Sequence, residues 1–224
     1  EKNMKNKLNT AIAALFVVTA SMGVMATEVG GTYVTAGMMK ISTDELDELK
    51  TISGVSVDDE DTVATLTVGY QFDKNLSFEA GAISEYDVSV TGAIASSSGT
   101  LFGKSYSFDA GDLTLKSKFD TGYTLGAKYG APVNESFDVY GRLGMYFWDT
   151  SAVASSTGDV TYDGTTTAAG TEVTIATESG SDVYLGIGSS YKINQSTSIN
   201  ADYLKFDIDG SDVDGLSLAV AFDF

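Results

Sequence analysis

The 224-residue sequence contains no cysteine, no histidine and a single proline. Without histidine and cysteine the chain has no Ser-His or Cys-His nucleophilic pair, and it has no imidazole ligand for a catalytic metal. We therefore expect that the protein is not an enzyme, and we predict neither a cofactor nor a metal. A chain without cysteine also forms no disulfide, so its fold must be stable without covalent cross-links.

Basic residues are also scarce. The sequence has 13 Lys and Arg and 31 Asp and Glu, which gives a formal net charge of -18. So acidic a chain is repelled by phosphate backbones, which excludes nucleic acid as a partner. Apolar residues almost never recur with the heptad-like spacing of a helix, whereas glycine, threonine, serine and aromatic residues are abundant. This composition favours an all-β fold.

The first 26 residues differ in kind from the rest of the chain. A basic start at 4–7 is followed by an apolar stretch at 11–19 and by small residues at 24–26. This order is typical of a secretory signal peptide, and we predict cleavage after Ala26. The prediction divides the chain into a signal peptide, 1–26, and one barrel domain, 27–224. The alternative, an uncleaved anchor, is disfavoured because the apolar stretch is short for a membrane span.

Short and long connections alternate between the strand-like runs of the remaining chain. The short ones, 73–75, 131–135 and 194–196, consist of turn-forming residues, whereas 42–60, 91–112 and 151–180 are long and polar. Transmembrane barrels have this asymmetry, with short periplasmic turns and long extracellular loops. The runs themselves are eight: roughly 32–41, 61–73, 76–90, 113–130, 136–150, 181–193, 197–208 and 214–224.

The runs have two unlike faces. At the end of the chain Leu216, Leu218 and Val220 alternate with small or polar residues, and in 113–130 the apolar face lies opposite Lys128. Aromatic residues gather near the turn-side ends of the apolar faces, and a second group recurs eight to ten residues away. The first group is Tyr33, Tyr70, Phe72, Phe78, Tyr129, Phe137, Tyr191, Phe222 and Phe224, and the second is Tyr86, Phe119 and Phe147.

Ten residues of a tilted strand rise about 25 Å, which is the height of the lipid-facing band between the aromatic girdles of a membrane barrel. Inside hydrocarbon every backbone N–H and C=O must be paired, and among sheets only a closed barrel achieves this. We therefore predict an all-β fold, an eight-stranded antiparallel up-and-down transmembrane β-barrel whose last strand closes against the first. A soluble, ligand-holding barrel of lipocalin type is the contrary fold.

Several segments resemble the transmembrane domain of outer membrane protein A. LGAKYGAP at 125–132, FDVYGRLG at 137–144 and WDT at 148–150 resemble its fourth and fifth strands, and LSFEAG at 76–81 resembles its third. The resemblance implies the outer membrane of a Gram-negative bacterium, surrounded by lipid and lipopolysaccharide. It also implies a monomer whose C-terminal strand engages the barrel assembly machinery. The peptidoglycan-binding domain of that family has no counterpart in this sequence.

In that family a polar cluster fills the lumen and can gate a narrow ion path. The resemblance implies that Glu79, Lys128 and Arg142 are members of this cluster. Asp202 stands where the family has an arginine, and Ser190 where it has a glutamate. Because a barrel of this size is just wide enough for side chains to fill, a satisfied polar core is the favoured interpretation. A narrow, low-conductance channel of porin-like type is the alternative.

The long loops carry two further candidate sites. Asp58, Asp59, Glu60 and Asp61, with the acidic stretch at 44–48, have the oxygen ligands of a weak cation site bridging to lipopolysaccharide phosphates. A solvated acidic exterior is the favoured interpretation.

The low-complexity segments at 155–158 and 165–170 suit an adhesive or phage-receptor tip, although a mobile loop is the default for such a composition. The segments 160–162 and 173–175 have the composition to extend the fifth and sixth strands as a hairpin above the membrane.

Together these observations predict a small outer membrane barrel with a structural, envelope-integrity or surface-interaction role and a lumen plugged by polar side chains. The alternatives are the narrow ion channel and an adhesin or phage receptor acting through the long extracellular loops.

Overall fold

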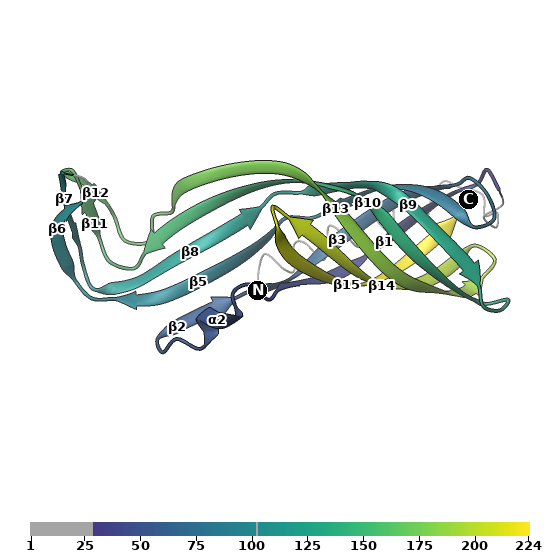
Figure 1. The fold of residues 1–224 in the computed structure, drawn as a ribbon, viewed down its shortest axis with the longest axis horizontal. Helices are drawn as coiled ribbons and strands as arrows, with labels where there is room; N and C mark the ends of the chain where they lie inside the picture. The colour runs from purple at the N-terminus through teal and green to yellow at the C-terminus, as the bar shows by residue number, and fades with distance from the viewer. Residues whose placement is uncertain (1–28, 102) are drawn as a thin grey trace.

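A computed structural model describes residues 29–101 and 103–224 (Figure 1). The predicted signal peptide at 1–26 lies outside these residues. The described chain is largely antiparallel β-strand, with one short helix, α2 (Asp47–Lys50). Among the described residues no helix is long and apolar enough to cross a membrane.

The barrel wall is a closed ring of antiparallel strands. Neighbouring strands pair in the order β13, β14, β15, β1, β3, β4, β9 and β10, and β10 pairs back to β13 to close the ring. The bounds are β1 (Thr32–Thr43), β3 (Glu60–Gln71), β4 (Leu76–Ile83), β9 (Gly122–Pro132), β10 (Phe137–Ser156), β13 (Val173–Asn194), β14 (Thr197–Ile208) and β15 (Ser211–Asp223). The predicted fold class, an antiparallel up-and-down barrel, is confirmed.

The last strand closes the barrel against the first, as the sequence predicts. Val34 lies opposite Phe222 and Met38 lies opposite Leu218 in the antiparallel register of β1 and β15. The pairing continues to the end of the chain, where the Phe224 N–H donates to the Thr32 carbonyl at 2.8 Å. Among the residues that the structure describes, no barrel strand is therefore left with an unpaired edge.

The three short turns are built on the same side-chain contact. Asp73 accepts a hydrogen bond from the N–H of Asn75 at 2.7 Å, and Asn134 and Asn194 do the same for the N–H two residues on. These are Asx-type turns, in which a short polar side chain replaces a backbone acceptor. The two amides at 75 and 76 hold the pKa of the Asp73 carboxyl below its ordinary value.

Beyond the barrel, four strands continue into a long stalk (Figure 1). β8 (Gly111–Phe119) pairs with β10 on one side and with β5 (Tyr86–Ile94) on the other, and β10 stays paired with β13 as far as Ala154 and Val173. β2 (Val55–Asp58) borders β5. A small sheet forms the tip, in the order β12 (Thr165–Thr167), β11 (Val160–Tyr162), β7 (Lys104–Phe108) and β6 (Ser97–Leu101).

The long polar connections predicted at 91–112 and 151–180 are therefore largely β-strand, and the mobile loop expected by default at 155–158 and 165–170 is in part strand as well. The segment at 173–175 does extend the wall, but 160–162 pairs with β7 and β12 instead of with 173–175. The runs expected at 76–90 and 113–130 are each divided, at 84–85 and at 120–121, where the chain leaves the barrel for the stalk. Thr–Thr hydroxyl contacts across the strand pairs, such as Thr91 with Thr114 at 2.9 Å, show why polar sequence can form this sheet.

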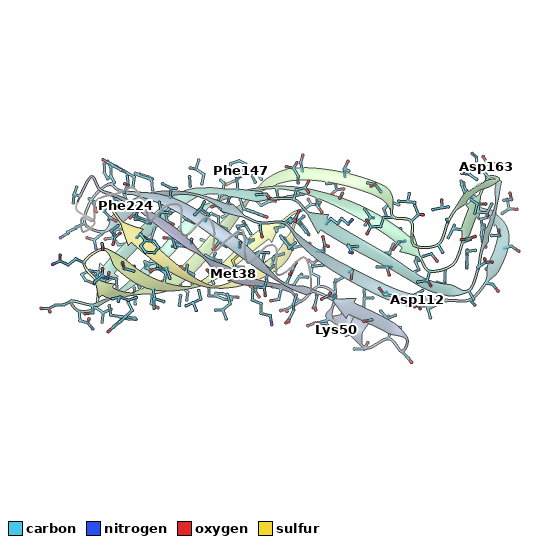
Figure 2. All side chains as sticks on the ribbon, turned by 180° about the vertical axis from the view of Figure 1, so that it is seen from behind. Met38, Lys50, Asp112, Phe147, Asp163 and Phe224 are labelled. Carbon is cyan, nitrogen blue, oxygen red and sulfur yellow. The ribbon has the colours of Figure 1, made fainter. Side chains whose placement is uncertain are left out.

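The outer surface of the barrel is apolar. Leu125, Leu185 and Leu218 are each more than half exposed, and Figure 2 shows Phe147 on the outside of the barrel. The predicted interface aromatics Tyr70, Phe72, Phe78, Tyr129 and Tyr191 are exposed, whereas Phe137, Phe222 and Phe224 are half-buried.

The expectation that Tyr33, Tyr86 and Phe119 face lipid is wrong. Tyr33 and Tyr86 are buried inside the barrel, and Phe119 stacks on Tyr86 with ring centroids 4.4 Å apart. The physical reason for Tyr33 is its hydroxyl, which finds a carboxylate partner in the lumen and has none in hydrocarbon.

The lumen has two layers. A charged layer lies toward the short turns, and an apolar layer lies toward the stalk. The apolar layer contains Met39, Ile41, Val63, Ile83, Tyr86, Tyr146, Trp148, Tyr184, Leu204, Phe206, Ile208 and Val213. This layer was not predicted from the sequence, because most of the bulky apolar side chains were assigned to the lipid face.

Lumen glycines make room for the rings. A Cβ added at Gly69 would lie 2.0 Å from the Tyr33 ring, and one added at Gly188 would lie 2.4 Å from the Tyr140 ring. Gly180 lies in the same way against Trp148. The narrow lumen therefore fits whole aromatic rings because the facing strand has no side chain at that point.

We predict that Gly69→Ala lowers the free energy of unfolding by about 1–3 kcal/mol, because the added methyl group overpacks the Tyr33 ring. Gly141→Ala is the matched control, since a Cβ there meets only a backbone oxygen at 3.7 Å. Urea unfolding in lipid vesicles measures both, and equal stability of the two variants would show that the ring contact is unimportant.

Candidate functional site

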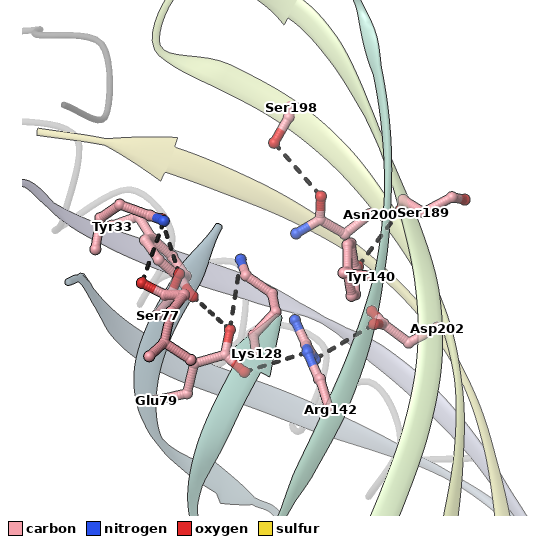
Figure 3. Close-up of polar contacts among 12 residues, drawn as sticks. Tyr33, Ser77, Glu79, Lys128, Tyr140, Arg142, Ser189, Ser198, Asn200 and Asp202 are labelled. Carbon is pink, nitrogen blue, oxygen red and sulfur yellow. Dashed lines mark hydrogen bonds and ion pairs between the residues drawn. The ribbon is translucent and has the colours of Figure 1, made fainter. Parts of the chain in front are cut away.

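Four charged side chains from four strands meet in the lumen (Figure 3). Glu79 lies on β4, Lys128 on β9, Arg142 on β10 and Asp202 on β14. Arg142 is directly opposite Lys128 in the register of β9 and β10, and Glu79 is opposite Gly126. Because side chains alternate along a strand, these four residues share the inner face at one level of the barrel.

Glu79 is the centre of the cluster. Its carboxylate lies 3.2 Å from Arg142 Nε and 3.6 Å from Lys128 Nζ. The Tyr33 hydroxyl donates a hydrogen bond to it at 2.6 Å. Arg142 also reaches Asp202, with its Nη1 atom 3.4 Å from Oδ1. The order of contacts is therefore Lys128, Glu79, Arg142 and Asp202, a chain of alternating charge.

Two tyrosine rings enclose the cations. Lys128 Nζ is 4.1 Å from the Tyr33 ring centroid and 5.3 Å from the Tyr140 centroid, and the Arg142 guanidinium is 5.2 Å from the latter. Cations over ring faces gain a further electrostatic attraction. The alternation of side chains along the strand predicts that Tyr140 faces inward. Tyr33 was assigned to the lipid face, so it was missed as a member of the cluster.

The cluster is balanced in charge and almost fully enclosed. It holds two cations and two carboxylates, and Glu79 and Asp202 are both buried. Buried charges are tolerated only when they are paired, and removing one partner exposes the full desolvation cost of the other. The arrangement therefore has the chemistry of a polar plug that fixes four strands relative to one another.

A small cavity of about 40 Å³ adjoins the plug, lined in part by Thr35, Arg142 and Asp202. Thr35 Oγ1, Arg142 Nη2 and Asp202 Oδ1 are buried there without a hydrogen-bond partner in good geometry. A space of this size accommodates water, and we expect ordered water to complete these hydrogen bonds. Ser190, where the resemblance implies a glutamate, lies on β13 opposite Asp138 and Asn200.

Two of the four acidic residues predicted as a cation site are paired with lysines. Asp59 is buried and lies 2.6 Å from Lys50 Nζ, and Glu60 lies 2.7 Å from Lys40 Nζ. Asp61 accepts a hydrogen bond from the Thr62 N–H, and Asp58 is exposed. In the part of the chain that the structure describes, no three acidic residues gather around a common point as a metal site requires.

A family model for the outer membrane protein beta-barrel domain matches residues 11–224, nearly the whole chain. The chain belongs to this family. Its place is accordingly the outer membrane of a Gram-negative bacterium, and the resemblance to outer membrane protein A is confirmed at the level of this barrel family. The exposed apolar band described above thus lies against lipid and lipopolysaccharide.

Two solved structures of outer membrane proteins are similar to this chain at low sequence identity. OprG from Pseudomonas aeruginosa is 16% identical, with 90% of this chain and 99% of that chain covered and a TM-score of 0.52. Ail from Yersinia pestis, in complex with the heparin analogue sucrose octasulfate, is 14% identical, with 88% and 100% covered and a TM-score of 0.47. No curated protein matches the sequence.

We predict that Glu79→Gln destabilises the barrel by about 3–5 kcal/mol, because it leaves Lys128 without its buried counter-charge and Arg142 with only one. Asp212→Asn is the control, since its ion pair with Lys205 is exposed and contributes little. Urea unfolding in vesicles measures both variants. A Glu79→Gln barrel as stable as the control would refute the role of the cluster as a structural plug.

Proposed function

We propose that the protein is a surface-interaction barrel, in which a sealed transmembrane wall anchors a rigid β-stalk that carries the contact surface away from the membrane. The wall itself contributes to envelope integrity, and we propose a monomer that the barrel assembly machinery inserts through the C-terminal strand. The main support for this role is the length of the paired strands beyond the barrel. β10 has 20 residues and β13 has 22, whereas a transmembrane strand needs about 9–11.

The tip of the stalk is an ordered structure. Tyr106 stacks on Phe108 with ring centroids 5.8 Å apart, and Lys104 lies 2.6 Å from Asp163. Backbone pairing of β7 with β11 joins the two long hairpins at their far end. A preorganised tip supports a binding role, because ordering a mobile loop on binding costs free energy.

The closed lumen also supports this role over the ion path. An ion passing the charged layer would next meet the apolar layer, which includes Met39, Tyr146 and Phe206. Entering such a layer strips the ion of water without replacing its ligands. The charge cluster is therefore better suited to hold the wall together than to conduct.

We predict that removing β6 and β7, two of the four strands of the tip, abolishes attachment and leaves the barrel folded. Ile94 and Gly111 are paired across β5 and β8, so a two-residue Asn-Gly turn can replace residues 95–110 and close the shortened hairpin. Bacteria displaying the wild type, this variant or the Gly141→Ala barrel control are counted on glass, on matrix-coated surfaces and in cell aggregates. Heat-modifiable migration on gels confirms folding of each. Equal attachment by all three would contradict the proposed role.

We predict that the purified protein gives no ion conductance in planar lipid bilayers, and that Glu79→Ala gives none either, because the apolar layer remains in both. Discrete current steps in the wild type that change in Glu79→Ala would favour the channel instead.

A further inference from the structure

A second cavity, of about 530 Å³, lies where the stalk meets the barrel. Its floor is the upper side of the apolar layer, with Ile41, Trp148 and Val213. Its walls come from the stalk, where Val88, Leu115 and Val153 line it. The volume is in the range of sites that enclose a small organic molecule.

The helix α2 and the residue before it form one side of this cavity. Leu46 and Leu49 line it, and Glu45, next to Leu46, accepts a hydrogen bond from the Ser211 hydroxyl at 2.9 Å. Lys50 binds Asp47 and Asp59 at 2.7 Å and 2.6 Å, which fixes the helix to the segment that follows β2. The contacts of Glu45 and Lys50, on either side of the two leucines in the chain, thus hold them over the cavity.

The walls present apolar and aromatic surface to the space. The stacked pair of Tyr86 and Phe119 and the Trp148 indole all line it. The polar end of Trp148 is already occupied, since Nε1–H donates to Asp182 at 2.7 Å. Apolar surface facing water is unfavourable in proportion to its area, so an apolar occupant would be stabilised there.

Charge at the rim decides which apolar molecule fits. The lining includes three acidic residues, Glu45, Glu178 and Asp209, against one basic residue, Lys116, whose Nζ lies 3.5 Å from Asp87. An anionic headgroup would therefore be repelled, and the chain as a whole is strongly acidic. This disfavours free fatty acids and the acyl chains of anionic lipids. Rings on the floor and wall favour a compact aromatic body over an extended chain.

We propose that this cavity is a binding site for an uncharged, aromatic small molecule that enters from the external medium. The site holds its ligand above the sealed apolar layer, so it is a receptor cup on the outer side of the barrel. The inference is independent of attachment by the stalk tip, since that tip lies at the far end of the stalk (Figure 1).

Trp148 provides the readout, because it is the single tryptophan of the sequence and lies in the cavity. The probe is phenylnaphthylamine, an uncharged aromatic amine that accepts excitation energy from tryptophan. With the protein in lipid nanodiscs, we expect saturable energy transfer from Trp148. Anilinonaphthalene sulfonate has the same rings with an added negative charge, and we expect it to bind at least about tenfold more weakly.

Ala152→Phe places a ring in the cavity and should weaken binding about tenfold, because the ring occupies space that the ligand needs. Ser151→Phe is the matched control, since Ser151 precedes Ala152 on β10 but does not itself line the cavity, and binding should be unchanged. Leu49→Asn removes one apolar side chain from α2, outside the barrel wall, and should weaken binding without affecting heat-modifiable migration.

Energy transfer that rises linearly with probe, equally in all variants, would mean partition into lipid only and would overturn the proposal. Equal binding of the anionic probe would overturn the assignment of an uncharged ligand. Displacement of the probe by acyl chains at lower concentrations than by naphthalene would overturn the aromatic assignment in favour of a lipid tail.

Discussion

The structure depends on one constraint, which is that a backbone polar group inside hydrocarbon has no water to pair with. Each unpaired N–H or C=O in such a medium costs several kcal/mol, so the sheet must close on itself. The seam between β1 and β15 meets this requirement along the length of β1 and up to the final residue. Once the seam is closed, side-chain alternation assigns one face to lipid and the other to a narrow lumen.

The narrow lumen sets the second problem, that of filling it. Toward the short turns it is filled by paired charges, with Glu79 between Lys128 and Arg142. Toward the stalk it is filled by aromatic and aliphatic side chains, and glycines on facing strands accept the rings. Both the charged layer and the apolar layer close the lumen. Only the apolar layer leaves apolar surface at the outer end, where it forms the floor of the cavity. Sealing the barrel and forming the cup are thus consequences of the same layer.

The sequence predicts the barrel well, because strand periodicity, short polar turns and the closing strand are local or paired features. The alternation of side chains along the strand is enough to predict that Leu125 faces outward and Lys128 faces the lumen. Parity fails for Tyr33, since tyrosine is compatible with an interface girdle and with a lumen, and the choice depends on Glu79 from another strand. The apolar layer was missed because an aliphatic side chain such as Met39 carries no sign of which medium it meets.

The stalk was missed for a related reason. Its sequence is polar, rich in serine and threonine and low in complexity, which is typical of loops. The structure compensates through pairing, since β8 has a partner on each side and hydroxyls meet across strands. Tertiary pairing thus overrides local composition here. The same pairing extends the barrel wall outward and shapes both the tip and the cavity below it.

Odd positions of β9 touch lipid and even positions touch the lumen, and the whole barrel depends on this alternation. Because the chain has no cysteine, single cysteines at each of positions 123–130 can carry a spin label in liposomes. Collision with oxygen dissolved in the bilayer should then alternate with a period of two, high at Tyr123, Leu125 and Tyr129 and low at Thr124 and Lys128. A flat profile, or one of opposite phase, would contradict the account.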